Sequence, residues 1–371
     1  MMERRVYAER AARACAAMEA HFRTREGLYR RDRRLRRPGT AAHLWPFSRA
    51  LFATLDLAGI DDALAGFDAD AAIAVDLGAL ERYWVPDGDP PAFSSDVIGT
   101  RIGGDRYYDD NAWVGLALVQ LERLRPGSGS LDRAEELFRF AVSGWDRREL
   151  TDAGGVLWVE QGRGIGTRNH DRNTVSNAPN AELGFHLAEL RGDAATEQGR
   201  AMYDWVLKTL DAGRGTESAG SGLFWDKVRG DGTIDKTLWT YNQGSMIGAN
   251  VLLARLEPPA QASVYLDRAE AIARKSLAHF SHVEYLRQPA AFNAIFFRNL
   301  LLLHPVTRDG ALQTDIVDTI RRYADHAWDH TRDRRDRFHL SDGGVTLLNQ
   351  SAVVQLLALL AWDPGAYGSL A

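Results

Sequence analysis

Long and short connections alternate between the helical segments of this chain, and this alternation constrains the fold more than any other feature of the sequence. Apolar residues at three- and four-residue spacing predict about twelve helices. These lie near residues 3–22, 41–58, 63–83, 108–125, 131–146, 178–191, 194–210, 242–256, 260–280, 291–303, 311–329 and 350–362. Connections after the odd-numbered helices are mostly much longer than the tight turns after the even-numbered ones; they are 23–40, 84–107, 147–177, 211–241, 281–290 and 330–349.

A closed ring of six antiparallel helical hairpins puts every long connection at one end. The alternation therefore predicts an all-α fold, an (α/α)6 barrel, with a few short β-hairpins in the long loops. Even-numbered segments such as 114–119, 246–253 and 351–357 are apolar on nearly all sides, which is typical of an inner layer. Odd-numbered segments carry the charges expected of an outer layer. No connection is rich enough in Gly and Ser to separate independent units, so we expect residues 1–371 to form a single domain.

Composition narrows the function. The 45 basic and 50 acidic residues give a net charge of -5, which argues against nucleic acid as the partner. No stretch approaches the roughly 20 apolar residues of a membrane span. Residues 1–13 lack the apolar run of a secretory signal, so we expect a cytoplasmic protein. The single cysteine, Cys15, excludes an intramolecular disulfide and a thiolate zinc cage.

Polar and aromatic residues gather where the even-numbered helices begin, at the end that carries the long loops. Amides hydrogen-bond hydroxyl groups, and flat rings cover the apolar C–H face of a pyranose, so the grouping indicates a sugar site. Long loops in compact domains are usually functional. The segments are 43–45, 107–113, 173–177, 239–243, 292–293 and 348–350, and the loops add Tyr83, Trp84, Trp158, Phe224 and Trp225.

Asp109 and Asp110 are the chemical centre of this interpretation. Adjacent acids at a helix start can simply cap the helix and complement its dipole. In a partly desolvated cleft, however, they repel each other, so one pKa rises while the other group stays ionised. That division supplies an acid and a nucleophile. Retaining glycosidases hold two carboxyls about 5–5.5 Å apart, which neighbouring residues of one turn can reach.

The segment Tyr108-Asp109-Asp110-Asn111-Ala112-Trp113 resembles the paired-aspartate motif of glycoside hydrolase family 76, the endo-α-1,6-mannanases. Residues 241–244 resemble a second family motif, and residues 172–177 a variant of a third. The resemblance implies an (α/α)6 barrel that cleaves α-1,6-mannosidic linkages in mannan or mannooligosaccharides with retention, using neither metal nor organic cofactor. Carried onto this chain, it makes Asp109 the nucleophile and Asp110 the general acid/base.

The candidate substrate-binding residues come from the same motifs and helix starts. They are Trp45, Tyr108, Asn111, Trp113, Arg172, Asn173, Asn177, Tyr241, Asn242, Gln243 and Phe292. The chain departs from the family pattern at Val114, where a second aromatic is common, and at Arg172, where lysine is frequent.

Other interpretations stay open at this stage. A terpenoid synthase also carries Asp-Asp on a helix, to hold magnesium, but it needs a further acid where this chain has Trp113. Sugar epimerases and unsaturated-uronide hydrolases use the same barrel, and the epimerases rely on histidines such as His170, His186 or His339. A non-catalytic carbohydrate-binding protein on this barrel needs no aspartate pair. Endo and exo cleavage are equally compatible with the sequence, which makes no prediction of oligomeric state.

Overall fold

The computed structural model describes residues 2–30, 41–61, 64, 66–99, 104–150, 152–214, 222–340 and 344–371. Within these ranges twelve helices of twelve residues or more follow one another along the chain, as the apolar spacing predicts. They are α1 (Met2–Phe22), α2 (Leu44–Ala58), α3 (Ala69–Leu80), α4 (Tyr108–Leu124), α5 (Ser130–Ser143), α6 (Thr174–Arg191), α7 (Thr196–Thr209), α8 (Thr240–Leu256), α9 (Pro259–His279), α11 (Ala290–Leu303), α12 (Gly310–His326) and α13 (Leu347–Ala361). The connection 281–290 holds a further short helix, α10 (His282–Arg287).

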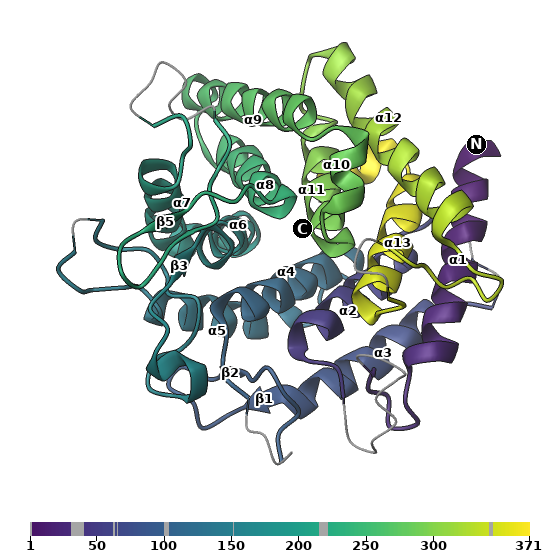
Figure 1. Cartoon of the computed structure of the whole chain (residues 1–371), viewed down its shortest axis with the longest axis horizontal. Coiled ribbons are helices and arrows are strands. Elements are labelled where there is room, and N and C mark those ends of the chain that lie inside the picture. The colour runs from purple at the N-terminus through teal and green to yellow at the C-terminus, as the bar shows by residue number, and fades with distance from the viewer. Residues whose placement is uncertain are drawn as a thin grey trace.

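The helices form two concentric rings (Figure 1). Helices α2, α4, α6, α8, α11 and α13 contact one another in that order, and α13 returns to α2, so the inner ring is closed. Outside it, α3, α5, α7, α9 and α12 each pack on the inner helix that precedes them, and α1 packs on α13. The predicted (α/α)6 barrel is confirmed.

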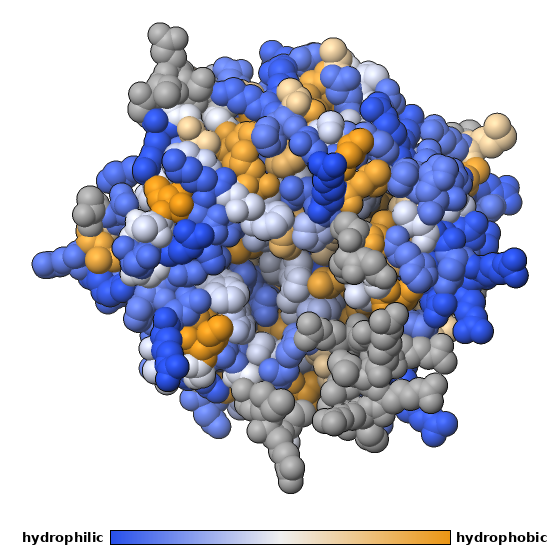
Figure 2. All heavy atoms as spheres, in the orientation of Figure 1, coloured by the Kyte–Doolittle hydropathy of each residue, from blue (hydrophilic) through white to orange (hydrophobic). Residues whose placement is uncertain are grey.

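The distribution of apolar residues along the chain explains which helices form the inner ring and which form the outer ring. The inner helices α8, α11 and α13 are buried over almost their whole length, whereas α5, α7 and α12 bury one face. Small residues let inner helices approach closely: a Cβ atom on Gly115 would lie 2.5 Å from Leu183, and one on Gly244 would lie 2.6 Å from the Cα of Phe296. Hydrophilic residues dominate the outline of the molecule in Figure 2, and hydrophobic ones appear as small scattered patches.

The few strands lie in the long connections, as expected. Strands β1 (Trp84–Val85) and β2 (Ala92–Phe93) form an antiparallel hairpin before α4. Strand β3 (Arg172–Asn173) leads directly into α6 and pairs with β4 (Lys227–Val228), which in turn pairs with β5 (Ile234–Asp235). The second sheet therefore joins the loop before α6 to the loop before α8, and these loops surround the mouth of the barrel.

The opposite end of the barrel is closed by buried polar contacts and by the last residues of the chain. The Arg298 guanidinium of α11 binds Asp56 of α2, and it also donates to Gln120 of α4 at 3.2 Å. Gln120 accepts the backbone N–H of Ala371 at 2.9 Å, and the Trp362 indole donates to the Asp56 carbonyl at 2.7 Å. Across the described ranges, the helices are too short or too polar to cross a membrane.

Amide side chains fasten the loops to the mouth of the barrel. In α4, α6 and α8, the residue four positions after the N-cap is an amide that accepts the N–H and binds the C=O of one loop residue. The same NH2 group also donates to the N-cap carbonyl. We call Asn111, Asn177 and Gln243 the amide clamps, and their loop partners are Phe93, Val156 and Phe224.

Each amide clamp acts as a second strand neighbour for a residue that already has one β partner, which is Trp84 for Phe93, Trp145 for Val156 and Asp211 for Phe224. Gln243 accepts the Phe224 N–H at 2.7 Å and donates to the carbonyls of Phe224 and Trp239, both at 3.0 Å. Gln350 of α13 also accepts a loop N–H, that of Phe338 at 3.3 Å, but its NH2 group donates to the carbonyls of Ala14 and Asp336. Buried backbone groups are costly to leave unpaired, so the clamps determine where the loops can lie.

We predict that Gln243→Ala lowers the free energy of unfolding by about 2–4 kcal/mol, because it leaves the buried N–H and C=O of Phe224 without partners. The matched control is Gln261→Ala on the exposed face of α9, which should change it by less than about 0.5 kcal/mol. Urea unfolding followed by circular dichroism measures both. Equal effects of the two substitutions would contradict a clamping role.

Candidate active site

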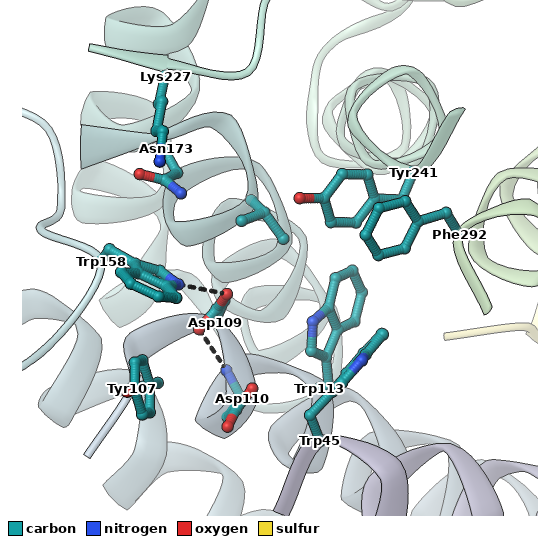
Figure 3. A pocket seen from close by; sticks show the side chains of 11 residues that line it. Trp45, Tyr107, Asp109, Asp110, Trp113, Trp158, Asn173, Lys227, Tyr241 and Phe292 are labelled. Carbon is teal, nitrogen blue, oxygen red and sulfur yellow. Dashed lines mark hydrogen bonds between the residues drawn. The ribbon is translucent and has the colours of Figure 1, made fainter. Parts of the chain in front are cut away.

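Asp109 and Asp110 occupy the first turn of α4, at the barrel end where the inner helices begin. Tyr108 fixes the start of this turn. Its ring stacks on Phe140 of α5 with centroids 4.4 Å apart, and its backbone N–H donates to the Trp158 carbonyl at 3.1 Å. With Tyr108 held from the outside, the two aspartates that follow it face the mouth of the barrel (Figure 3).

The aspartates line a cavity of about 290 Å³. Side chains from α2, α4, α6, α8 and α11 and from three of the long loops meet there, although these elements are far apart in the sequence. This convergence is what the ring of inner helices predicts. The lining consists of Trp45, Tyr107, Asp109, Asp110, Trp113, Trp158, Asn173, Val175, Lys227, Tyr241 and Phe292.

Three aromatic pairs form the walls of the cavity. Tyr241 and Phe292 stack in parallel with centroids 3.9 Å apart, and Trp45 lies 5.9 Å from Trp113. The third pair, Tyr107 and Trp158, lies beside the aspartates at 4.9 Å. Flat rings around carboxyl groups suit a ligand with apolar C–H faces and many hydroxyls, which is the character of a sugar.

A buried cation supports the tryptophans from below. Arg49 of α2 is 1% exposed, and its guanidinium lies 5.6 Å from the Trp45 ring and 5.7 Å from the Trp113 ring. The same guanidinium packs on Phe52 at 4.4 Å and binds Gln355. Burial lowers the pKa of Arg49 to about 9. These cation–π contacts hold both indoles in place under the cavity.

Hydrogen bonds distinguish the two aspartates. Asp109 accepts the Trp158 indole N–H at 3.1 Å through Oδ2 and the backbone N–H of Asp110 at 2.9 Å through Oδ1. Two such donors favour the ionised form of Asp109. Burial nevertheless raises the pKa of Asp109 to about 7. Burial and the charges of Asp109 and Asp96 raise the pKa of Asp110 well above its usual range.

As the pH rises, Asp109 therefore ionises first, and Asp110 keeps its proton to a higher pH. Two carboxyls this close resist being ionised together. The N–H donors serve Asp109, so its anion is the better stabilised of the two. The site thus combines a carboxylate with a neighbouring carboxylic acid.

A third carboxyl, Asp226, lies behind the cavity. It is buried, and the Asn242 amide faces it at 3.4 Å. Burial, followed by the charges of Asp226 and Asp109, raises the pKa of Tyr241 well above its usual range, so its phenol stays protonated. Tyr241 therefore presents a hydroxyl donor to the cavity (Figure 3).

The sequence profile of glycosyl hydrolase family 76 matches residues 94–357, well over half of the chain and the whole of the segment that carries both aspartates. The chain belongs to glycoside hydrolase family 76. Comparison with curated proteins gives no match.

Several solved structures share the fold of this family 76 enzyme. A mannosidase from Bacteroides thetaiotaomicron is 22% identical with a TM-score of 0.79, over 96% of this chain and 98% of that one. An α-1,6-mannanase of Salegentibacter sp., in complex with α-1,6-mannotriose, is 19% identical with a TM-score of 0.75, over 96% and 99%. That protein is an inactive variant with two adjacent aspartates changed to asparagine. Dfg5 of Chaetomium thermophilum, in complex with glucosamine, is 16% identical with a TM-score of 0.68, over 95% and 90%.

Seven predicted site residues of the family 76 enzyme meet in the cavity: Asp109, Asp110, Trp45, Trp113, Asn173, Tyr241 and Phe292. Three others, Asn111, Asn177 and Gln243, lie behind its wall as the amide clamps. Their polar atoms bind loop backbone, so the expectation that they contact substrate is corrected.

Three further candidates also lie outside the cavity lining. Tyr108 is buried against Phe140. The Arg172 guanidinium donates to the carbonyls of Asp152 and Gly154, the latter at 2.8 Å, which fixes the loop before β3. Asn242 is buried beside Asp226. All three support the site without facing its cavity, which corrects the expectation of direct contact.

The structure adds Lys227 to the site, a residue that the sequence patterns do not predict. Lys227 reaches the cavity because β4 pairs with β3, which puts Lys227 opposite Asn173. Its ammonium group binds Asp171 at 2.9 Å and lies 6.0 Å above the Trp158 ring. A pairing between residues that are 54 positions apart, such as Asn173 and Lys227, leaves no local sequence signal. Within the described ranges, no group of three or more His, Cys, Asp or Glu side chains is arranged to hold a metal ion.

We predict that Asp110→Asn raises Tm by about 2 °C or more at about pH 8 and has little effect near pH 4. A carboxyl with a raised folded-state pKa is destabilising only where the unfolded chain ionises, so the penalty is absent at low pH and grows above about pH 4. Asparagine removes the penalty. Thermal unfolding followed by circular dichroism at the two pH values measures it.

Asp132→Asn is the matched control, because Asp132 is an exposed acid in the first turn of α5 that binds Arg191 at 2.6 Å. It should lower stability slightly, by less than about 1 kcal/mol. A fall in Tm for Asp110→Asn at pH 8 would instead show that Asp110 caps its helix.

Proposed function

We propose that the chain is a retaining glycoside hydrolase that cleaves α-1,6-mannosidic linkages in mannan or mannooligosaccharides. Asp109 is the nucleophile and Asp110 the general acid/base. The observation that carries the proposal is the division of labour between the adjacent carboxyls. Asp109 accepts two N–H donors that stabilise its anion, and burial with neighbouring charge keeps the proton on Asp110.

In the first step the Asp109 carboxylate attacks the anomeric carbon of the sugar in the cavity. The bond from that carbon to the glycosidic oxygen breaks, and the oxygen takes the proton of Asp110. A covalent glycosyl ester on Asp109 and an ionised Asp110 result. The Trp158 indole N–H stays bonded to Oδ2 of Asp109, which orients the carboxyl during attack.

In the second step the roles of the aspartates reverse. Asp110 takes a proton from a water molecule, the water oxygen bonds to the anomeric carbon, and the ester bond to Asp109 breaks. Both carboxyls then regain their starting protonation states. Two inversions at the same carbon give overall retention.

The cavity walls support a neutral sugar as substrate. Tyr241 with Phe292 and Trp45 with Trp113 offer faces for stacking, while the Tyr241 hydroxyl and the Asn173 amide offer hydrogen bonds. The mannose identity and the 1,6 linkage rest on the family and on the α-1,6-mannotriose bound by the Salegentibacter enzyme.

The histidines weigh against an epimerase. His186 is buried on α6, where its ring contacts Arg123 at 2.9 Å and burial lowers its pKa to about 4. His186, His170 and His339 are absent from the lining of the cavity that holds the aspartates. Nothing favours this second function over glycoside hydrolysis.

We predict that the protein hydrolyses α-1,6-mannotriose and that the first-formed hemiacetal is the α-anomer in proton NMR. Asp109→Asn should lower kcat by at least about 10³-fold, because no ester can form on the amide. Asp110→Asn should slow mannotriose hydrolysis far more than hydrolysis of a nitrophenyl α-mannoside, whose leaving group needs no proton. Asp132→Asn is the control and should keep the wild-type rate.

A first-formed β-anomer would contradict retention. Binding of mannotriose without release of sugar by the wild-type protein would instead indicate a non-catalytic carbohydrate-binding protein.

A further inference from the structure

A second cavity, of about 400 Å³, adjoins the one that holds both aspartates. The two cavities share three lining residues, Trp45, Tyr107 and Asp110, so they form neighbouring parts of one groove. Asp109 lines only the first cavity. The second is completed by His43, Pro46, Ser95, Asp96, Gly104, Asp105 and Leu348.

Because Asp109 lines only one of the two cavities, the groove determines which way round a substrate binds. In the proposed reaction the nucleophile must reach the anomeric carbon, whereas the acid must reach the oxygen between that sugar and the next one. Asp109 faces the first cavity alone, and Asp110 stands where the two cavities meet. The sugar whose anomeric carbon is attacked therefore lies in the first cavity, and the departing sugar lies in the second.

The lining of the second cavity suits hydroxyl groups. The His43 imidazole binds Asp96, with Nδ1 2.7 Å from Oδ1, and both side chains are partly exposed. Asp96 also accepts the Ser95 hydroxyl at 3.1 Å, which fixes the orientation of the carboxyl and of the ring. An imidazole, a carboxylate and a hydroxyl together offer donors and acceptors, while Trp45 and Tyr107 offer aromatic faces.

The loop that carries Ser95 and Asp96 is held in the same way as the loops of the first cavity. Trp158 lies two residues after the clamped Val156, and Asp226 lies two residues after the clamped Phe224. Ser95 likewise lies two residues after Phe93, which Asn111 clamps. Residues two apart in an extended segment share a face. The clamp on Phe93 thus brings Ser95 to the groove as the clamp on Val156 brings Trp158.

We infer that the second cavity is the binding site for the sugar on the leaving-group side, and that the His43–Asp96 pair recognises hydroxyl groups of that sugar. This inference rests on the proposed function, because it assigns a direction to the same reaction. A manno-oligosaccharide then lies across both cavities with its scissile oxygen at Asp110. Substrates with a sugar as leaving group gain contacts that a small leaving group cannot make.

The test compares two substrates that differ only on the leaving side. α-1,6-Mannotetraose has a sugar leaving group, whereas the α-fluoride of α-1,6-mannobiose has none. We expect His43→Ala to lower the ratio of kcat/KM for mannotetraose to kcat/KM for the fluoride by about tenfold, the loss typical of one hydrogen bond to a substrate. His43→Gln, which keeps a donor towards Asp96, should restore part of the ratio.

Asn173→Ala is the matched control, because Asn173 lines only the first cavity. It should lower both rates and leave their ratio within about twofold. Thermal unfolding confirms that each variant is folded.

The possible results separate the two proposals. An unchanged ratio in His43→Ala would overturn the assignment of the second cavity, as would a wild-type protein that hydrolyses the fluoride but no oligosaccharide. A wild-type protein that hydrolyses neither substrate would overturn the proposed function, and the direction of the groove with it.

Discussion

Amide side chains at the start of the inner helices govern the positions of the loops at the barrel mouth, and the site depends on them. Asn111, Asn177 and Gln243 each bind the N–H and C=O of one loop residue as a neighbouring strand would. Two positions after Phe93 and Val156, Ser95 and Trp158 line the groove, whereas Asp226, two positions after Phe224, lies behind it. Through this spacing the clamp on Val156 places the Trp158 indole against Asp109, and the clamp on Phe224 places Asp226 behind it. The ring of helices alone would not determine which loop residues lie next to the cavity.

The amide clamps also affect the pKa values of the two aspartates. Burial alone would raise the pKa of both aspartates and leave them equivalent, which gives no acid and no nucleophile. The clamped Trp158 breaks this equivalence, because its N–H stabilises one anion, and the Asp96 charge adds to the cost of ionising the other carboxyl. The backbone contacts that hold the loops therefore also determine which aspartate carries the proton. Functional sites commonly accept such a penalty in stability.

The sequence predicts the fold well because the fold is a matter of helix count and connection length, and both are local properties. It also predicts the aspartate pair and the aromatic residues at the helix starts, which project from the ring into its mouth. It fails for the amides, since an amide that binds a hydroxyl and an amide that binds backbone look identical in a sequence. Their common position, four residues after the N-cap, is the signal that could have separated them from Asn173. Lys227 could not be predicted from the sequence, because the pairing of β3 with β4 joins loops that are distant along the chain.

The central claim is that Asp109 is ionised while Asp110 keeps its proton in the free enzyme. Neutron diffraction from deuterium-exchanged crystals grown well above pH 7, where Asp109 is ionised, tests this most directly, since it locates the deuterium itself. We expect deuterium density on a carboxyl oxygen of Asp110, no density on either oxygen of Asp109, and deuterons of Trp158 Nε1 and the Asp110 backbone directed at Asp109. Deuterium on Asp109, or on neither carboxyl, would contradict the account.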